Sequence, residues 1–368
     1  MNYHGGDIYQ YKEEMTDFSA NINPLGIPEH FSRILTKDLS SLTRYPDRHY
    51  RKLKASIRKY LQLDQEAHLV LGNGAIEVIY KTIQALPVRS VLIACPTFSE
   101  YERAARMAGI PVREEVLYDG KGKLDVKALA NLLEEKDLVI VCNPNNPTGT
   151  LTSKEELLVL GKLIQEKQGY LLVDETFIEF TKDYPETSVM DAKEGNFIII
   201  RALTKYFGMP GIRLGYGVFH QKKLASEVEE LMEPWHINSI ADLAGQTVLH
   251  DRNYQEATRR WILEESAFIM MELEKLTDFT FLPTESNFIL LTSKSHKAEK
   301  IQEMLLEAGL LIRLPIGFKG LSDNAFRIAI KDHASNRKLL AELEKIERSV
   351  SLNQEKRKNQ IDKNNKLE

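Results

Sequence analysis

A lysine and an arginine eight residues apart could carry chemistry in this chain. Lys205 follows the apolar run 197–200, and Arg213 lies in the glycine-containing segment that comes next. A lysine amine that is held in place with a lowered pKa can form a Schiff base with an aldehyde cofactor. Arg213 and Thr204 could then bind the phosphate of that cofactor. Most lysine–arginine neighbours are solvated surface charge, so the interpretation depends on the segments upstream.

Two buried strands are predicted upstream, and each leads into a polar side chain. The apolar run 137–142 enters a turn that contains Asn146, and the run 170–173 ends in Asp174. The carboxyl ends of parallel strands form the ligand-binding edge of an α/β sheet. We therefore expect Asn146 and Asp174 to lie near Lys205.

The spacing of Asn146, Asp174, Lys205 and Arg213 resembles that of fold-type I pyridoxal-phosphate enzymes of the aminotransferase superfamily. The resemblance implies that Lys205 binds pyridoxal 5'-phosphate. It also implies that Asp174 pairs with the pyridinium nitrogen, which makes the ring an electron sink. Asn146 would hydrogen-bond the ring hydroxyl.

A glycine-rich helix start could bind the cofactor's phosphate. Gly74 opens a predicted helix whose first N–H groups and positive dipole end suit an anion. By itself this is ordinary helix capping, but it matches the phosphate site of the family. Many relatives carry hydroxyl residues where this chain has Ile76 and Ala202. Phosphate binding is therefore expected to rely on backbone N–H groups, Thr204 and Arg213.

Two aromatic residues complete the implied cofactor site. Phe98 stands where the family stacks an aromatic ring on the cofactor, although a core phenylalanine would look the same. Tyr45 resembles the tyrosine that reaches the cofactor phosphate of the neighbouring subunit, which implies a homodimer with shared active sites. The implied cofactor-binding residues are Gly74, Ala75, Ile76, Phe98, Asn146, Asp174, Thr204, Lys205, Arg213 and Tyr45.

The N-terminal arm narrows the resemblance. His4-Gly5-Gly6 and the segment 17–26 closely resemble threonine-phosphate decarboxylases of cobalamin biosynthesis, and the similarity extends to about Ile346. Segments 96–101 and 235–238 also match this group of decarboxylases. Phe177 replaces a tyrosine that many aminotransferases carry. The implied reaction is decarboxylation of L-threonine O-3-phosphate to (R)-1-aminopropan-2-yl phosphate.

Two arginines would hold the two anionic groups of the substrate and so decide which bond to its Cα breaks. The resemblance implies that Arg327 binds the substrate carboxylate and that Arg313 binds its phosphate, since a guanidinium matches both anions. Without the resemblance, both could equally form surface or interface salt bridges. Lys205 is the expected acid that returns a proton to Cα. The implied substrate-binding residues are His4, Asn21, Asn146, Arg313 and Arg327.

Three alternatives stay open. Histidinol-phosphate aminotransferase also binds a phosphorylated amine, so Arg313 does not separate it from the decarboxylase; Phe177 and the arm favour the decarboxylase. A non-catalytic cofactor-binding regulator would need a DNA-binding domain, for which no room remains. Serine phosphate differs from threonine phosphate by one methyl group, worth roughly 1–3 kcal/mol of discrimination.

Composition limits the classes of function. The 368 residues are 43% hydrophobic and 28% charged, as expected for a soluble globular protein. The net charge of -4 gives no support for nucleic-acid binding. Cys95 and Cys142 make neither a disulfide framework nor a metal cluster, so no metal is expected. No signal peptide or membrane span is predicted, and we expect a cytoplasmic protein.

The order of predicted elements indicates an α/β fold: a large doubly wound domain with a mostly parallel sheet, plus a smaller α+β domain. Residues 1–28 would form an arm over the active site, 29–240 the large domain, 241–350 the small domain and 351–368 a disordered polar tail. A long helical stretch is expected from Trp235 to about Leu276. The predicted strands cover 91–94, 138–142, 170–174, 197–200, 288–291, 310–312 and 326–330.

Overall fold

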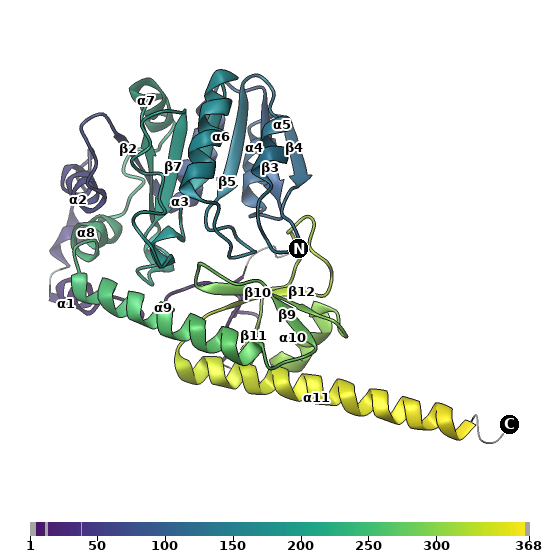
Figure 1. Cartoon of the computed structure of the whole chain (residues 1–368). Coiled ribbons are helices and arrows are strands. Elements are labelled where there is room, and N and C mark those ends of the chain that lie inside the picture. Colours follow the sequence, from purple (N-terminus) through teal and green to yellow (C-terminus); the bar gives the residue numbers. More distant parts are fainter. Residues whose placement is uncertain (1–4, 12–13, 38, 365–368) are drawn as a thin grey trace.

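The centre of the molecule is a seven-stranded sheet with the order β2-β8-β7-β6-β5-β3-β4 (Figure 1). The computed structural model describes residues 5–11, 14–37 and 39–364. The strand β8 runs antiparallel to both of its neighbours, and the pairs from β7 to β4 are parallel. This confirms the predicted α/β class. The strands are β2 (His68–Asn73), β3 (Ser90–Cys95), β4 (Val112–Val116), β5 (Asp137–Cys142), β6 (Tyr170–Asp174), β7 (Phe197–Ala202) and β8 (Leu214–Phe219).

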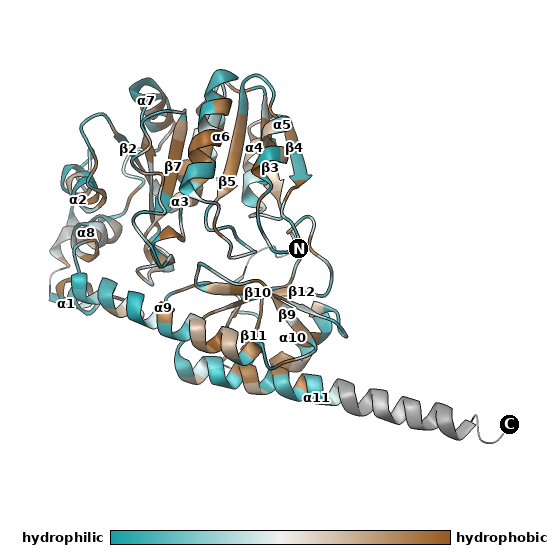
Figure 2. Ribbon diagram, viewed as in Figure 1, coloured by the Kyte–Doolittle hydropathy of each residue, from teal (hydrophilic) through white to brown (hydrophobic). Residues whose placement is uncertain are grey.

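Helices cover both faces of this sheet, and alternate strand residues enter two separate cores. On β7, Ile198 and Ile200 join one core, whereas Phe197 and Ile199 join the other. The central strands are buried along their whole length and are strongly hydrophobic (Figure 2). The helices are α1 (Glu29–Lys37), α2 (Arg51–Leu61), α3 (Ala75–Ala85), α4 (Glu100–Met107), α5 (Val126–Asn131), α6 (Lys154–Glu166), α7 (Lys222–Glu230) and α8 (Ser239–Val248).

The strand β8 was not predicted, because its two glycines make the sequence look like a loop. Gly215 is required by packing: a Cβ there would lie 2.1 Å from the Ala75 nitrogen. The missing side chain lets the first turn of α3 approach the sheet closely. The segment after Lys205 therefore returns through the sheet as β8, beside the start of α3, where the sequence predicted the phosphate site.

A second unit contains the three-stranded antiparallel sheet β12-β10-β9. The predicted long helix after Trp235 is two helices, because Asp251 caps a new helix by accepting a hydrogen bond from the Tyr254 N–H. The backbone of the last helix continues to Asn364, across most of the segment for which the sequence predicted disorder. The domain limits stay a prediction. The elements are α9 (Arg252–Leu273), β9 (Phe279–Phe281), β10 (Phe288–Ser293), α10 (Ala298–Glu307), β11 (Leu310–Leu311), β12 (Ala325–Ala329) and α11 (His333–Asn364).

The N-terminal arm joins the two units. Its short strand β1 (Thr16–Asp17) pairs in parallel with β11. Farther along, the Asn23 N–H donates to the Lys205 carbonyl oxygen at 3.3 Å. The arm therefore connects β11 of the second unit to the candidate catalytic lysine. In the described part of the chain, every helix is too short or too polar to cross a lipid bilayer.

Candidate active site

One pocket of about 290 Å³ collects most of the predicted site residues. It lies where the carboxyl ends of β5, β6 and β7 meet the arm and the strand β12, as expected for an α/β sheet. The predicted residues that line it are Asn21, Ala75, Ile76, Phe98, Asn146, Asp174, Thr204, Lys205, Arg213, Arg313 and Arg327.

Lys205 follows β7 and lies half-buried in this pocket. Burial, reinforced by the nearby cations of Arg327, Arg213 and Lys331, lowers the pKa of its amine to about 8. The amine can therefore reach its uncharged, nucleophilic form close to neutral pH. This is the property that a Schiff-base lysine requires.

Asp174 ends β6 and is buried beneath the pocket. Its carboxylate accepts hydrogen bonds from the Tyr101 hydroxyl at 2.7 Å, and from the hydroxyl and N–H of Thr176. Burial raises its pKa above the ordinary value, against the opposite effect of these hydrogen bonds. The sequence did not identify Tyr101 or Thr176 as site residues. The Asp-x-Thr pattern could have indicated Thr176, whereas no comparable signal marks Tyr101.

The start of α3 and Arg213 form one end of the pocket. Gly74 caps the helix with a φ of 81°, and a Cβ there would lie 2.2 Å from Arg213 Nη2. The guanidinium also donates weakly to the Asn73 carbonyl oxygen, at 3.4 Å. The glycine thus lets an arginine lie against the N–H groups of a helix start, an arrangement that suits a phosphate group. Ile76 offers no hydroxyl here.

Phe98 and Asn146 lie on the pocket walls. The Phe98 ring meets the Tyr101 ring edge-on, with 5.6 Å between centroids. Asn146 is buried, and its side-chain oxygen accepts a hydrogen bond from Arg327 Nη1. Phe177, the residue that replaces a tyrosine, lines the same pocket and packs on Phe288 at 5.0 Å.

The two predicted substrate arginines lie directly opposite each other on the backbone. The Arg313 N–H donates to the Arg327 carbonyl at 3.0 Å, and the Arg327 N–H donates back at 2.9 Å. Such a pair places both side chains on one face of the sheet. Burial lowers the pKa of Arg313 to about 10, and burial together with Arg313 lowers that of Arg327 to about 9.

Each arginine is held by neighbouring carbonyl groups. Arg327 Nη2 donates to the Ser19 carbonyl at 2.6 Å. Arg313 donates to the carbonyls of Leu314 and Ile316, at 3.0 and 2.8 Å. Its guanidinium also lies 4.9 Å from the centre of the Phe318 ring, a contact that the sequence did not indicate.

Two buried polar atoms in the pocket are candidates for binding a ligand. The Asn21 side-chain oxygen and Arg327 Nε have no hydrogen-bond partner among the described residues. Buried polar groups are rarely left unpaired in native proteins. His4, the other predicted arm residue, lies outside the described residues.

Tyr45 does not line this pocket. Its side chain is 80% exposed and contacts the Trp235 ring, with 4.6 Å between the centroids and a tilt of 31° between the ring planes. Its predicted contact with a partner's cofactor stays a prediction.

The pocket residues fit pyridoxal phosphate. The Lys205 amine, with its lowered pKa, matches the aldehyde, and the buried carboxylate of Asp174 matches the ring nitrogen. The aromatic wall matches the ring face, and the helix start beside Arg213 matches the phosphate. Cys95 and Cys142 are free buried thiols. Within residues 5–11, 14–37 and 39–364, no group of acidic, histidine and cysteine side chains could hold a metal ion.

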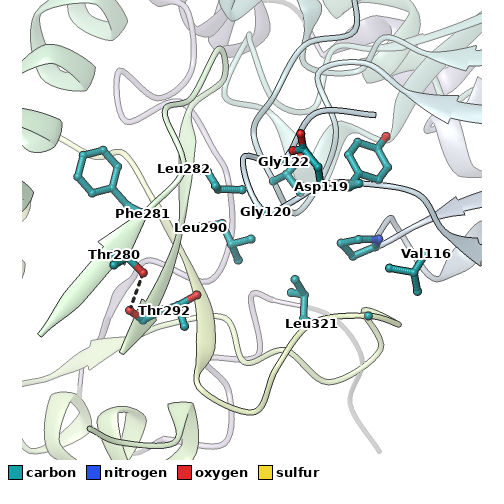
Figure 3. A pocket seen from close by; sticks show the side chains of 14 residues that line it. Val116, Asp119, Gly120, Gly122, Thr280, Phe281, Leu282, Leu290, Thr292 and Leu321 are labelled. Atoms are coloured by element: carbon teal, nitrogen blue, oxygen red, sulfur yellow. Dashed lines mark hydrogen bonds between the residues drawn. The ribbon is translucent and has the colours of Figure 1, made fainter. Parts of the chain in front are cut away.

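A second cavity, of about 240 Å³, lies between the two units (Figure 3). Val116, Leu282, Leu290 and Leu321 contribute much of its apolar lining. Its one carboxylate, Asp119, already accepts hydrogen bonds from the N–H groups of its own turn. This cavity therefore lacks the lysine and arginine cations that line the first pocket.

Comparisons with known proteins agree with this geometry. A threonine-phosphate decarboxylase of Salmonella typhimurium is 33% identical, over 93% of this chain and 96% of its own length. The structure of a histidinol-phosphate aminotransferase from Clostridium acetobutylicum is 38% identical, with a TM-score of 0.86, over 90% of this chain and 99% of its own. That of an L-threonine-O-3-phosphate decarboxylase from Porphyromonas gingivalis is 26% identical, with a TM-score of 0.78, over 89% and 98%.

The family model for aminotransferases of class I and II matches residues 13–343, which include all of the pocket except Gly5. The chain therefore belongs to the aminotransferase class I and II family.

Proposed function

We propose that this protein is a pyridoxal-phosphate-dependent decarboxylase of L-threonine O-3-phosphate that forms (R)-1-aminopropan-2-yl phosphate. The observation that carries the proposal is the Arg313–Arg327 pair: two buried cations side by side in the pocket that holds Lys205. They suit a small substrate with two anionic ends, a carboxylate and a phosphate.

Arg327 would bind the carboxylate, and Arg313 the phosphate. Holding both ends would fix how Cα lies in the pocket and so decide which bond to Cα is presented for cleavage. When bound, pyridoxal phosphate supplies an electron sink for the electron pair of the bond that breaks. Because both pKa values stay well above 7, both arginines are charged at neutral pH.

Lys205 and Asp174 would have complementary roles. The Lys205 amine, with its pKa near 8, can hold a proton and return it to Cα after CO2 leaves. Asp174 would face the ring nitrogen, held in orientation by Tyr101 and Thr176. A carboxylate there favours the protonated ring, the better electron sink.

Phe177 supports the decarboxylase over the aminotransferase as the function of this chain. A phenylalanine in this wall offers no hydroxyl to the ring oxygen, whereas many aminotransferases have a tyrosine there. The relatives named above include both activities, and the Salmonella decarboxylase matches nearly the whole chain. Histidinol-phosphate aminotransferase is therefore the competing function, and serine phosphate the competing substrate.

The active unit in this proposal is a homodimer. Tyr45 is exposed and points to no site of its own chain, as expected if it completes the partner's cofactor site. The two free thiols suit a reducing compartment, so we place the enzyme in the cytoplasm.

The test is product analysis with the purified holoenzyme. Threonine phosphate, serine phosphate and histidinol phosphate are supplied separately, each with and without 2-oxoglutarate, and CO2 and glutamate are measured. We expect CO2 from threonine phosphate without any need for 2-oxoglutarate. Glutamate formation from histidinol phosphate with no CO2 from either phosphorylated amino acid would contradict the proposal.

A further inference from the structure

Lys331 is a second lysine close to the site, and its backbone is firmly held. It follows β12, four residues after Arg327. Its N–H donates to the Asn336 side chain at 2.9 Å, and its carbonyl accepts from Trp261 Nε1 at 2.9 Å. The side chain is half-buried, and burial lowers its pKa. A held, partly desolvated lysine that does not line the pocket needs an explanation.

The Lys331 ammonium group holds the turn of the arm that covers the pocket. Its Nζ donates to the Ala20 carbonyl at 3.2 Å, and Arg327 Nη2 donates to the preceding carbonyl, that of Ser19. Two cations from the end of one strand therefore hold two consecutive carbonyls. On the other side of the turn, the Asp17 carboxylate accepts from the N–H and hydroxyl of Ser19, at 2.8 and 2.6 Å.

The turn carries groups that face the ligand. Ser19, Ala20 and Asn21 line the pocket, and the Asn21 side-chain oxygen has no partner among the described residues. Two residues farther on, Asn23 bonds to the Lys205 carbonyl. A displacement of this turn would therefore move both a ligand-facing amide and the arm that contacts the lysine loop.

We propose that Lys331 is a positioning residue: it fixes the turn 17–21 so that Asn21 and Arg327 face the anionic groups of the substrate. The proposal rests on the proposed function. Arg327 is shared between the turn, Asn146 and the substrate carboxylate, so it cannot fix the turn by itself. The Lys331 ammonium group donates to the Ala20 carbonyl of the turn and remains available when Arg327 binds substrate.

The experiment compares three variants of the holoenzyme. Lys331→Met removes the ammonium group, and Lys331→Arg keeps a cation. Lys345→Met is the control, because Lys345 is an exposed lysine on α11 with a surface salt bridge to Glu342. Amide hydrogen exchange of residues 16–23 reports on the turn. The dissociation constant of phosphoethanolamine, together with KM and kcat for threonine phosphate, reports on binding.

For Lys331→Met we expect exchange over residues 16–23 to rise, and phosphoethanolamine to bind about tenfold more weakly, the typical effect of losing one charge-assisted hydrogen bond. KM should rise more than kcat falls. Lys331→Arg should restore most of both, and Lys345→Met should resemble the wild type. If Lys331→Met does not fold, Lys331→Gln is judged by the same readouts.

Unchanged exchange and affinity in the folded Lys331→Met variant would overturn the proposal. Weaker binding without faster exchange would mean that Lys331 acts by charge alone, and faster exchange with unchanged binding would remove its role toward the substrate. If the wild type itself releases no CO2 from threonine phosphate, the proposed function is wrong, while the exchange data still test whether Lys331 holds the turn.

Discussion

The lowered pKa of Lys205 predicts unusual reactivity of its amine in the cofactor-free protein. With a pKa of about 8, about one tenth of the amine is uncharged at pH 7. For a free lysine with a pKa near 10.4, the uncharged fraction is roughly 0.1% or less. Lys205 should therefore be at least about 100-fold richer in the nucleophilic form than free lysine at this pH.

The assay is competitive acylation of the apoprotein with a trace of acetic anhydride at a series of pH values. Nα-acetyl-lysine in the same mixture serves as the free reference, and mass spectrometry quantifies each adduct. The sign follows from burial: a lysine whose charged form is disfavoured loses its proton at lower pH. Labelling of Lys205 should rise with pH, reach its midpoint near pH 8 and then level off, whereas the reference continues to rise above pH 10.

A substitution separates the contributions to this shift. Arg327→Met removes one of the cations that disfavour a charged Lys205, so the midpoint should move to higher pH and labelling at pH 7 should slow. Arg348→Met, at an exposed position on α11, should leave the midpoint unchanged. A wild-type midpoint near that of the free reference, or an Arg327→Met midpoint equal to the wild type's, would refute this account of Lys205.

Four further predictions concern the proposed chemistry. Lys205→Ala should remove the visible absorbance of the lysine-bound cofactor and nearly all turnover; a variant that decarboxylates at the wild-type rate would exclude Lys205 from its role. Arg327→Ala should lose decarboxylation far more than affinity for phosphoethanolamine, which lacks a carboxylate, with a binding loss for threonine phosphate of roughly 1.5–3 kcal/mol. Arg313→Ala should weaken both ligands, because both carry the phosphate; equal losses of phosphoethanolamine affinity in the two arginine variants would mean that their roles are wrongly assigned. Mixing Tyr45→Phe and Lys205→Ala subunits should form hybrid dimers more active than either parent, since one site carries neither lesion; confirmed hybrids without recovery would place Tyr45 outside the partner's site.

The sequence alone was enough to predict the parallel strands β3, β5, β6 and β7 and several of their ligand-facing ends. The strands that lead to Asn146 and Asp174, and the strand before Lys205, are continuous apolar runs, because strands buried on both faces leave no room for polar residues. The glycine that precedes a helical pattern of apolar residues also indicated the helix start at Gly74. These features depend on residues that are adjacent in the chain, so they can be predicted from the local sequence pattern.

Other elements could not be predicted because a nonlocal contact decides them. The strand β8 looked like a loop, since its glycines are explained only by the close approach of α3. The break between α8 and α9 depends on the cap at Asp251 within a stretch of helical composition. Tyr101 supports Asp174 from 73 positions away, and nothing in its own segment identifies that partner.

Tertiary structure alone decided the electrostatics of the site. Arg313 and Arg327 belong to separate segments, and a backbone bridge places them side by side. Lys331 reaches the arm across 311 positions of sequence, to the Ala20 carbonyl. The pKa of Lys205 depends on how deeply its amine is buried and on which cations the fold brings near it. Residue types set which charges the chain has, but desolvation and distance set their strength, and both exist only once the chain has folded.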